Sequence, residues 1–585
     1  MSVNISKQKR DVLISKIKEL KDFINASPQD KNTQNLLGYI GDILKEIDRK
    51  KYGLVFEEHQ EKIDIILSKS LPILTEEKDL EINNDGELNF LIEGDNLAAL
   101  QLLEKTHKGK IDVIYMDPPY NTKKKDFKYD DSYVDPTDEF KHSKWLSFMD
   151  KRLKIAQKLL SEKGVLFISI DDHEQADLKI LCDEIFDEKN FAGQLILKTA
   201  TDNNPSQINT EHEYMICYCK MRNKQTNWKR QNTAAKLLIE KYEELKSLNL
   251  EIDKMQKELR KWIKENKKQL PQLAHYNNID ERGIYSSSSN SSNPHPGGYT
   301  YDIIHPITKK PCPKPKNGWR WPLSTFEEYD KQGEIEWGKD DTTQPHVKKR
   351  LETSTEYLRS LIYEDNRATT MELEKIFGEK DVFKNPKPHN VLAKLFDYVT
   401  TKSSTILDIF AGSGSTGHAV LLLNKEDDGH RKFILCNNNE NNICKDITYQ
   451  RLKTVITGKR KDGSIYSEGL PGSLKYFKVD YLSVDEQMYY EFSDELLNYI
   501  RELIELENGI DMNTSESTYI LMDDEELEEF INSIRTHKKC KALYVSHDVL
   551  ASTQQEQLLH KNGIEIKTIP EYYYPDTETR GSDDH

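Results

Sequence analysis

Apolar runs of strand length alternate with amphipathic runs of helical length in two parts of this 585-residue chain. In the first part, residues 87–95 predict a strand, 96–107 a helix and 111–117 a strand whose apolar residues are continuous. A continuous apolar run is typical of a parallel strand that is buried on both faces. The alternation therefore predicts an α/β fold built on a parallel sheet.

The same pattern continues beyond these elements and returns later in the chain. The further expected elements are a helix over 143–164 that ends on Gly164, a strand over 164–172, a helix over 176–186, a strand over 212–220, a helix over 390–400, a strand, loop and helix over 404–424, and a strand over 432–440. Between the two parts, the chain contains a charged stretch that predicts a long helix or a helical hairpin. A stretch rich in Ser, Pro, Gly, Lys and aromatic residues follows it.

These changes of pattern divide the chain into five segments. Residues 1–85 form a helical N-terminal region, 86–220 and 381–464 form two halves of one α/β core, 221–380 form an inserted α+β domain, and 465–585 form an acidic C-terminal domain with a small α/β pattern of its own.

The composition favours a cytoplasmic protein that has no membrane segment. No apolar stretch approaches the ~20 residues of a membrane span, and the first ten residues lack the apolar core of a signal peptide. The seven cysteines are scattered, and Cys217 and Cys219 have no second pair nearby, so we expect reduced thiols and no metal site. The net charge is −16, but basic clusters lie in the middle of the chain, so a nucleic-acid partner is not excluded.

A glycine loop follows the strand that begins the second part of the core. Gly412 and Gly414 separate the strand from the next helix, where glycine allows a sharp turn and a close approach to a ligand. The spacing matches neither the G-x-G-x-x-G fingerprint nor a Walker loop, and Glu440 ends the next strand at the offset where an acid meets a ribose diol. The loop indicates a nucleoside cofactor without a pyrophosphate, and a purely structural strand–helix turn is the alternative.

The strand over 111–117 ends in Asp117, Pro118, Pro119 and Tyr120. Prolines fix the backbone and carry no N–H, so a rigid carbonyl beside the carboxylate could accept hydrogen bonds from one amino group. Two such acceptors would favour a tetrahedral nitrogen whose lone pair is free to attack, and Tyr120 offers a face on which a flat base could stack. The alternative is a plain Asp-Pro-Pro turn capped by an aromatic residue.

The two motifs together, DPPY at 117–120 and FAGSG at 410–414, resemble the signatures of S-adenosylmethionine-dependent amino-methyltransferases that act on DNA bases. Their order, with the insertion between them, is similar to the permuted β-type arrangement. The fuller resemblance is to the Mod subunits of Type III restriction–modification systems, over roughly residues 50–220 and 380–460. It implies a permuted Rossmann-like methyltransferase sheet in which the insert recognises the target.

The resemblance also implies roles for individual residues. Asp117, the Pro118 carbonyl and Tyr120, with Pro119 in the same motif, would hold a flipped adenine whose N6 accepts a methyl group. The expected cofactor-binding residues are Asp408, Phe410, Gly412 and Gly414 for the methionine part, Glu440 for the ribose, Asp95 for the adenine and Lys387 at the flank. Asp95 could also cap the helix that follows it, and Lys387 could be ordinary surface charge.

The implied partners are double-stranded DNA, a second copy of the chain and a Res helicase–endonuclease subunit, while an orphan enzyme remains the alternative. In the insert, Lys309, Lys310, Lys314, Lys316 and Arg320, interleaved with Tyr299, Trp319 and Trp321, suit contacts with phosphates and grooves. Cytosine-N4 methylation and a non-catalytic DNA-binding subunit with the same fold are the competing functions. The sequence does not predict which DNA site is recognised.

Overall fold

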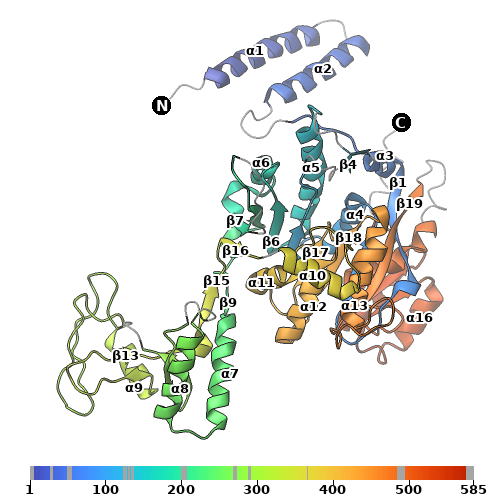
Figure 1. Ribbon diagram of the computed structural model, residues 1–585. Coiled ribbons are helices and arrows are strands. Elements are labelled where there is room, and N and C mark those ends of the chain that lie inside the picture. Colours follow the sequence, from blue (N-terminus) through green and yellow to red (C-terminus); the bar gives the residue numbers. More distant parts are fainter. Residues whose placement is uncertain are drawn as a thin grey trace. The chain divides into compact units, whose positions relative to one another are not determined.

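The computed structural model describes residues 5–26, 31–48, 56–122, 128–129, 132–133, 138–198, 207–267, 270, 273–287, 291–364, 366–483 and 494–574. The chain divides into two compact units (Figure 1). The first unit comprises Met1–Gln225, Leu361–Asn390 and Lys402–His585, and the second comprises Thr226–Ser360 and Val391–Thr401.

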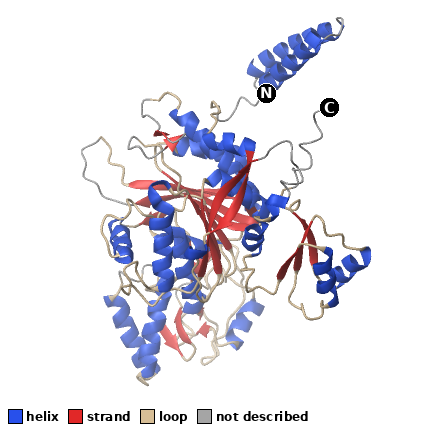
Figure 2. Ribbon diagram, turned by 90° about the vertical axis from the view of Figure 1, so that its right-hand side faces the viewer, coloured by secondary structure: helices blue, strands red, loops and turns tan. Residues whose placement is uncertain are grey.

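A ten-stranded sheet forms the centre of the first unit, with helices around it (Figure 2). Its strands, in their order across the sheet, are β1 (Ser70–Glu76), β19 (Ser473–Ser483), β2 (Leu88–Glu93), β18 (Lys432–Asn437), β17 (Thr405–Asp408), β3 (Ile111–Met116), β6 (Leu160–Ile170), β8 (His212–Cys219), β7 (Phe191–Lys198) and β16 (Leu361–Tyr363). All neighbours from β19 to β6 run parallel, which confirms the predicted α/β class. Antiparallel pairs occur only towards the two edges in the described sheet, where β1 meets β19 and β8 meets β6 and β7.

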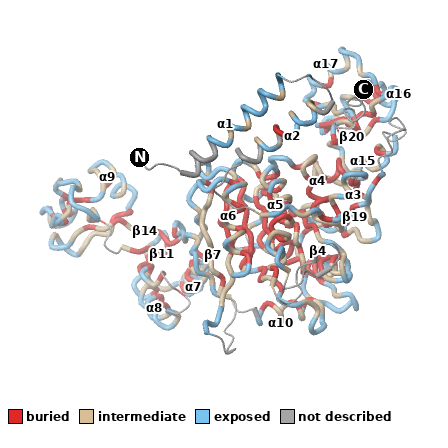
Figure 3. The backbone as a smooth tube through the Cα atoms, turned by 90° about the horizontal axis from the view of Figure 1, so that it is seen from above, coloured by how far each residue is buried: buried red, intermediate tan, exposed pale blue. Residues whose placement is uncertain are grey.

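Helices α4 (Asn96–His107), α5 (Lys141–Leu159) and α6 (Gln175–Phe186) pack side by side against this sheet. Their residues Leu100, Trp145 and Leu178 are fully buried in one core with Ile114 and Ile168 of the strands. Figure 3 shows the buried backbone concentrated in these strands and helices. In the second half of the core, α12 (Ser415–Asp427) packs against α13 (Gln450–Thr457), which also contacts α10 (Asn366–Phe377). A rigid hydrophobic core therefore supports the strand ends.

The helix expected over 143–164 ends earlier than predicted. α5 ends at Leu159 and β6 begins at Leu160, so Gly164 lies inside the strand and does not stop the helix. A Cβ at Gly164 would lie 2.9 Å from the Ile111 carbonyl oxygen, and the register of β3 with β6 shifts between Ile111 and Val113. Glycine is needed there because two backbones approach closely, which the sequence pattern does not distinguish from a helix stop.

The sheet extends beyond the residues in which we expected strands. α3 (Lys62–Lys69) and β1 lie in the segment that we assigned to a helical N-terminal region, and β19 lies in the segment assigned to the C-terminal domain. The two helices expected near the N-terminus are present as α1 (Ile5–Ala26) and α2 (Lys31–Asp48), which pack against each other.

The C-terminal segment forms a small parallel α/β layer in the order β20-β21-β22, as its pattern predicted. Its elements are α15 (Ile500–Asn508), β20 (Thr518–Leu521), α16 (Asp524–Asn532), β21 (Ala542–Ser546), α17 (Thr553–Lys561) and β22 (Glu565–Ile569). Tyr544 and Tyr573 are buried in the main core, so this layer and the large sheet share packing.

The second unit begins with a helical hairpin. The charged stretch for which we predicted one long helix or a helical hairpin forms two helices, α7 (Thr233–Ser247) and α8 (Ile252–Glu265). The two helices pack against each other and share a core around Leu238 and Leu259. The other elements are short: β9 (Lys229–Gln231) with β15 (Thr355–Tyr357), β10 (Asn278–Asp280) with β11 (Gly283–Ser286) and β14 (Lys349–Arg350), β12 (Ile335–Glu336) with β13 (His346–Val347), and α9 (Leu323–Lys331). This mixture agrees with the predicted α+β character of the insert.

Some small elements complete the description. They are β4 (Lys128–Tyr129) with β5 (Ser132–Tyr133), α11 (His389–Val399), and the short helices η1 (Lys78–Leu80), η2 (Glu188–Asn190), η3 (Arg222–Lys224), η4 (Leu351–Thr353), η5 (Glu440–Asn442) and the π-helix η6 (Ile443–Tyr449). Within the described residues, we find no helix that is both long enough and apolar enough to cross a membrane.

Candidate active site

The two sequence motifs follow neighbouring strands. β3 pairs in parallel with β17, with Tyr115 opposite Asp408, so Asp117 and Phe410 leave the sheet at the same edge. From β17 the chain crosses to β18 on one side, and from β3 it crosses to β6 on the other. Ligands of open α/β sheets bind where the strand order reverses in this way, beyond the carboxyl ends of the strands. The topology therefore places both motifs at one binding crevice.

Four side chains converge beyond β3, and we call them the Asp117 corner: Asp117, Tyr120, Glu213 and Lys387. The Lys387 ammonium donates to the Tyr120 hydroxyl at 2.6 Å and to Glu213 Oε2 at 2.8 Å, and its Nζ lies 3.3 Å from Asp117 Oδ1. The Tyr120 hydroxyl lies 3.0 Å from Asp117 Oδ1 and 3.2 Å from Glu213 Oε2. Two carboxylates, one phenol and one ammonium thus share a single network.

Burial and charge set the protonation of this corner. Burial raises the pKa of Asp117, and the Lys387 charge opposes that rise, while Glu213 adds to it. Burial alone would lower the pKa of Lys387, but Asp117 and Glu213 outweigh it, and the pKa of Lys387 rises above its ordinary value. Burial raises the pKa of Tyr120 well above its ordinary value, so this phenol remains a donor. Lys387 therefore stays charged and keeps two negative groups in place.

The two proline carbonyls differ in their surroundings. The buried Trp145 indole donates to the Pro119 carbonyl at 2.7 Å. Within the described part of the chain, no residue donates to the Pro118 carbonyl. One carbonyl therefore anchors the turn, and the other remains an acceptor next to Asp117.

Backbone geometry shapes the glycine loop, residues 410–414, beyond β17. Gly412 and Gly414 have φ of +49° and +77°, in the left-handed region that glycine adopts without strain. Asp408 holds the turn, because its Oδ1 accepts from the Phe410 amide at 2.9 Å and its Oδ2 from the Thr416 hydroxyl at 2.5 Å. Burial raises the pKa of Asp408 to about 7. The carboxylate of Asp408 thus closes the loop onto the first turn of α12.

The π-helix η6 and helix α13 support the same loop. The Thr448 hydroxyl donates to the Gly412 carbonyl at 2.6 Å. The buried Arg451 donates through Nη1 to the Ser413 carbonyl at 3.2 Å, to Ser413 Oγ at 3.0 Å and to Ser415 Oγ at 2.9 Å. Ser415 Oγ in turn donates to the Lys387 carbonyl at 2.7 Å. Lys387 thus joins the two motifs, through its backbone to the glycine loop and through its ammonium to the Asp117 corner.

Asp95 and Glu440 follow the next two strands, β2 and β18, which are also neighbours in the sheet. Asp95 caps α4, since its Oδ1 accepts from the Leu97 amide at 2.8 Å, and it lies 3.6 Å from Arg152 Nη2. The predicted cap is therefore present, and the carboxylate is still 37% exposed. Glu440 begins the short helix η5, directly before η6.

Sequence reasoning selected Lys387 as a residue at the flank of a cofactor, whereas its ammonium lies in the Asp117 corner. It did not select Glu213, Thr448 or Arg451. Glu213 stands near the start of the apolar strand β8, so a lone charge in that strand was an available signal. Nothing in the spacing around Thr448 and Arg451 indicates a role, because their contacts depend on the π-helical turn.

In this arrangement, a carboxylate and a carbonyl acceptor after β3 stand beside a glycine loop after β17. In agreement, a family model described as DNA methylase matches residues 111–450, more than half of the chain. The chain belongs to this DNA methylase family.

Two relatives are Mod subunits of Type III restriction-modification enzymes. The EcoP15I Mod subunit of Escherichia coli is 38% identical over 60% of this chain and 58% of its own length. The StyLTI Mod subunit of Salmonella typhimurium is 30% identical over 64% of this chain and 56% of its own length. The Type II methyltransferase M.KpnI of Klebsiella pneumoniae is 32% identical over 61% of this chain and 82% of its own length. The matches thus span less than two thirds of the two Mod subunits.

Proposed function

We propose that this protein is a site-specific DNA methyltransferase that moves a methyl group from S-adenosylmethionine to N6 of a flipped adenine in duplex DNA. The observation that carries the proposal is the bridge made by Lys387. It links the glycine loop, suited to a cofactor, to the Asp117 corner, suited to an amino group.

The residues of the crevice fit the proposed cofactor. A Cβ on Gly412 would lie 3.6 Å from the Phe383 ring, in ordinary van der Waals contact, so it is the positive φ of the loop that favours glycine there. Phe410, Gly412 and Gly414 would hold the methionine part, with Asp408 fixing the loop, and the carboxylates of Asp95 and Glu440 would hold the adenosine part. When bound, S-adenosylmethionine supplies an electrophilic methyl group.

At the Asp117 corner, the Asp117 carboxylate and the Pro118 carbonyl would accept the two N–H bonds of the amino group. This arrangement localises the nitrogen lone pair for attack, so catalysis depends on positioning and electrostatic complementarity. The Tyr120 hydroxyl and the Lys387 ammonium, which now lie near Asp117, would yield their place at that oxygen to the base. Glu213 would keep Lys387 beside the pocket during this exchange.

DNA would have to present the base outside the helix, because an adenine inside the duplex cannot reach Asp117. In the second unit, we propose that Lys309, Lys310, Lys314, Lys316 and Arg320 contact phosphates. Trp319 is buried beside Tyr301 in the core of that unit, so it cannot make the phosphate or groove contacts that we expected, whereas Tyr299 is exposed. Packing in the hydrophobic core of the second unit explains why a tryptophan stands at position 319.

The similarity to Mod subunits supports a place in a Type III restriction–modification system, as a cytoplasmic homodimer joined by a Res subunit. Such a subunit would supply ATP hydrolysis and cleavage. A methyltransferase that acts without Res is the second candidate, because M.KpnI is matched over more of its own length than either Mod subunit. Copurification with a Res subunit encoded beside this gene would separate the two.

The experiment that tests the activity is a map of modified adenines in DNA from cells with and without this gene. We expect N6-methyladenine at one short sequence only in cells that carry the gene. Methylation of cytosine N4 would show that the acceptor base is cytosine and not adenine. The absence of any new modification, together with no binding of S-adenosylmethionine by the purified protein, would contradict the proposal.

A further inference from the structure

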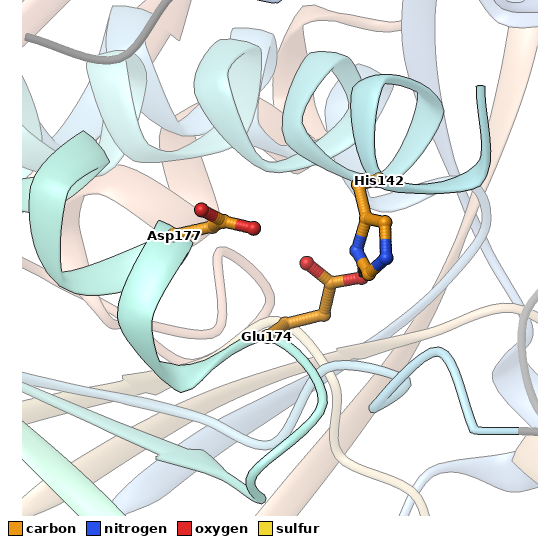
Figure 4. A group of neighbouring side chains, drawn as sticks. All are labelled: His142, Glu174 and Asp177. Carbon is orange, nitrogen blue, oxygen red and sulfur yellow. Dashed lines mark hydrogen bonds and ion pairs between the residues drawn. The ribbon is translucent and has the colours of Figure 1, made fainter. Parts of the chain in front are cut away.

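A histidine and two carboxylates cluster at the start of two neighbouring helices, α5 and α6 (Figure 4). His142 lies in the first turn of α5, Glu174 directly precedes α6, and Asp177 lies in its first turn. One potential ligand atom from each of the three residues lies within 4.8 Å of the others. Figure 4 shows the His142 ring and both carboxylates facing a common space.

Glu174 is the unusual member of this cluster, because its side chain is completely buried. Its Oε1 accepts from Asn121 Nδ2 at 2.6 Å and lies 2.7 Å from His142 Nδ1. Its Oε2 is buried and has no hydrogen-bond partner within the described chain. A buried carboxylate oxygen without a partner costs free energy. This oxygen is therefore open to interaction with an external ligand.

The charges around the cluster do not supply that group. Lys141 and His173 interact with the charge of Glu174, but neither makes a hydrogen bond with its Oε2 in the described chain. His173 is engaged with Asp171, with its Nδ1 3.0 Å from that carboxylate.

We propose that His142, Glu174 and Asp177 bind a divalent transition-metal cation. One imidazole nitrogen and two carboxylates suit Zn²⁺ or Mn²⁺ better than Mg²⁺ or Ca²⁺, which prefer oxygen ligands alone. The cation would interact with the unpaired Oε2 of Glu174. His142 is 47% exposed, so a cation can enter from solvent.

This site would act on the Asp117 corner through one residue. Asn121 directly follows Tyr120, has a φ of +57°, and donates to Glu174 and to the Lys141 carbonyl. A cation that fixes Glu174 therefore fixes the chain just after the DPPY motif. This second step rests on the proposed function, whereas cation binding itself does not.

Mn²⁺ binding to the chelator-treated full-length protein tests the site, with the loss of the free Mn²⁺ electron paramagnetic resonance signal as the readout. We expect one Mn²⁺ per chain, displaced by Zn²⁺ and not by Mg²⁺. Glu174→Gln should weaken binding by about tenfold or more, and His142→Ala, at a half-exposed side chain, should do the same. Melting curves from circular dichroism confirm that each variant is folded.

Asp548→Asn is the matched control, because Asp494, His547 and Asp548 form another cluster of the same composition in the described chain. It should leave Mn²⁺ binding unchanged. The proposal is overturned if the wild-type protein shows no saturable binding, if Glu174→Gln and His142→Ala bind as tightly as wild type, or if Asp548→Asn is the variant that loses the cation. If Mn²⁺ binds while no methyl transfer is found, the site stands and the proposed function fails.

Discussion

The Asp117 corner and the glycine loop lie beyond adjacent strands, yet different forces hold them. In the corner, side chains from three distant parts of the chain form one network of charges around Lys387. In the loop, positive φ angles and hydrogen bonds fix the shape: Thr448 and Arg451 donate to backbone carbonyls, and Asp408 accepts from an amide and a hydroxyl. The corner is therefore sensitive to charge, and the loop is sensitive to shape.

This contrast predicts that cofactor binding and methyl transfer can be impaired separately. A change in the corner should lower methyl transfer and leave cofactor affinity nearly unchanged. A change in the loop supports should weaken cofactor binding and leave the rate at saturation nearly unchanged. Each prediction below tests this separation.

Asp117→Ala should have the largest effect. It removes the carboxylate acceptor proposed for the amino group, so methyl transfer should fall by about a thousandfold or more. The loop does not contact this carboxylate, so the affinity for S-adenosylmethionine, measured by calorimetry, should change by less than about threefold. A collapse of cofactor affinity with surviving methylation would show that Asp117 belongs to the cofactor site.

Lys387→Met should come next, with a loss of about a hundredfold in kcat, because Tyr120 and Asp117 lose the cation that orients them. Since the Lys387 charge lowers the pKa of Asp117, its removal should raise that pKa further. The carboxylate must be deprotonated to accept from an amine, so the acidic limb of the rate–pH profile should move to higher pH.

Glu213→Gln removes a negative charge from the same network, whereas Lys387→Met removes a positive one. Glu213 raises the pKa of Asp117, so its neutralisation should move the acidic limb to lower pH. Rate–pH profiles of the two variants measured side by side check the sign. A shift in the same direction for both would mean that Asp117 does not set this limb.

Arg451→Lys tests the loop. Lysine keeps the charge but cannot make the three Nη1 contacts with Ser413 and Ser415, so cofactor affinity should fall by about tenfold, with kcat at saturating cofactor within about twofold of wild type. The Arg451 side chain is fully buried, so a melting curve must accompany the measurement. Equal losses in kcat and affinity would show that the loop and the corner are not separable.

Much of this site could be predicted from sequence because local patterns encode it. The continuous apolar run of β3 and the strand before Gly412 predicted a parallel sheet, and Asp117 and the glycines stand at strand ends where chemistry is expected. The contacts of Glu213, Thr448 and Arg451 could not be predicted, because each depends on residues distant in sequence or on a π-helical turn. Trp319 was misjudged because an aromatic residue among lysines suits a surface and a small core equally well.

Thr448→Val should have the smallest effect and gives the sharpest test of the loop. The change keeps the size of the side chain and removes the hydroxyl, which lies 2.6 Å from the Gly412 carbonyl oxygen, 3.2 Å from the Ile443 carbonyl oxygen and 3.4 Å from Asn437 Nδ2. The shortest of these contacts is the one that supports the glycine loop. A lost hydrogen bond of this kind costs about 1 kcal/mol, so cofactor affinity should fall by about fivefold. The rate–pH profile should not move, because no charge of the Asp117 corner changes. A shifted acidic limb in Thr448→Val would show that loop shape reaches Asp117 through Ser415 and Lys387, and the two regions would then act as one.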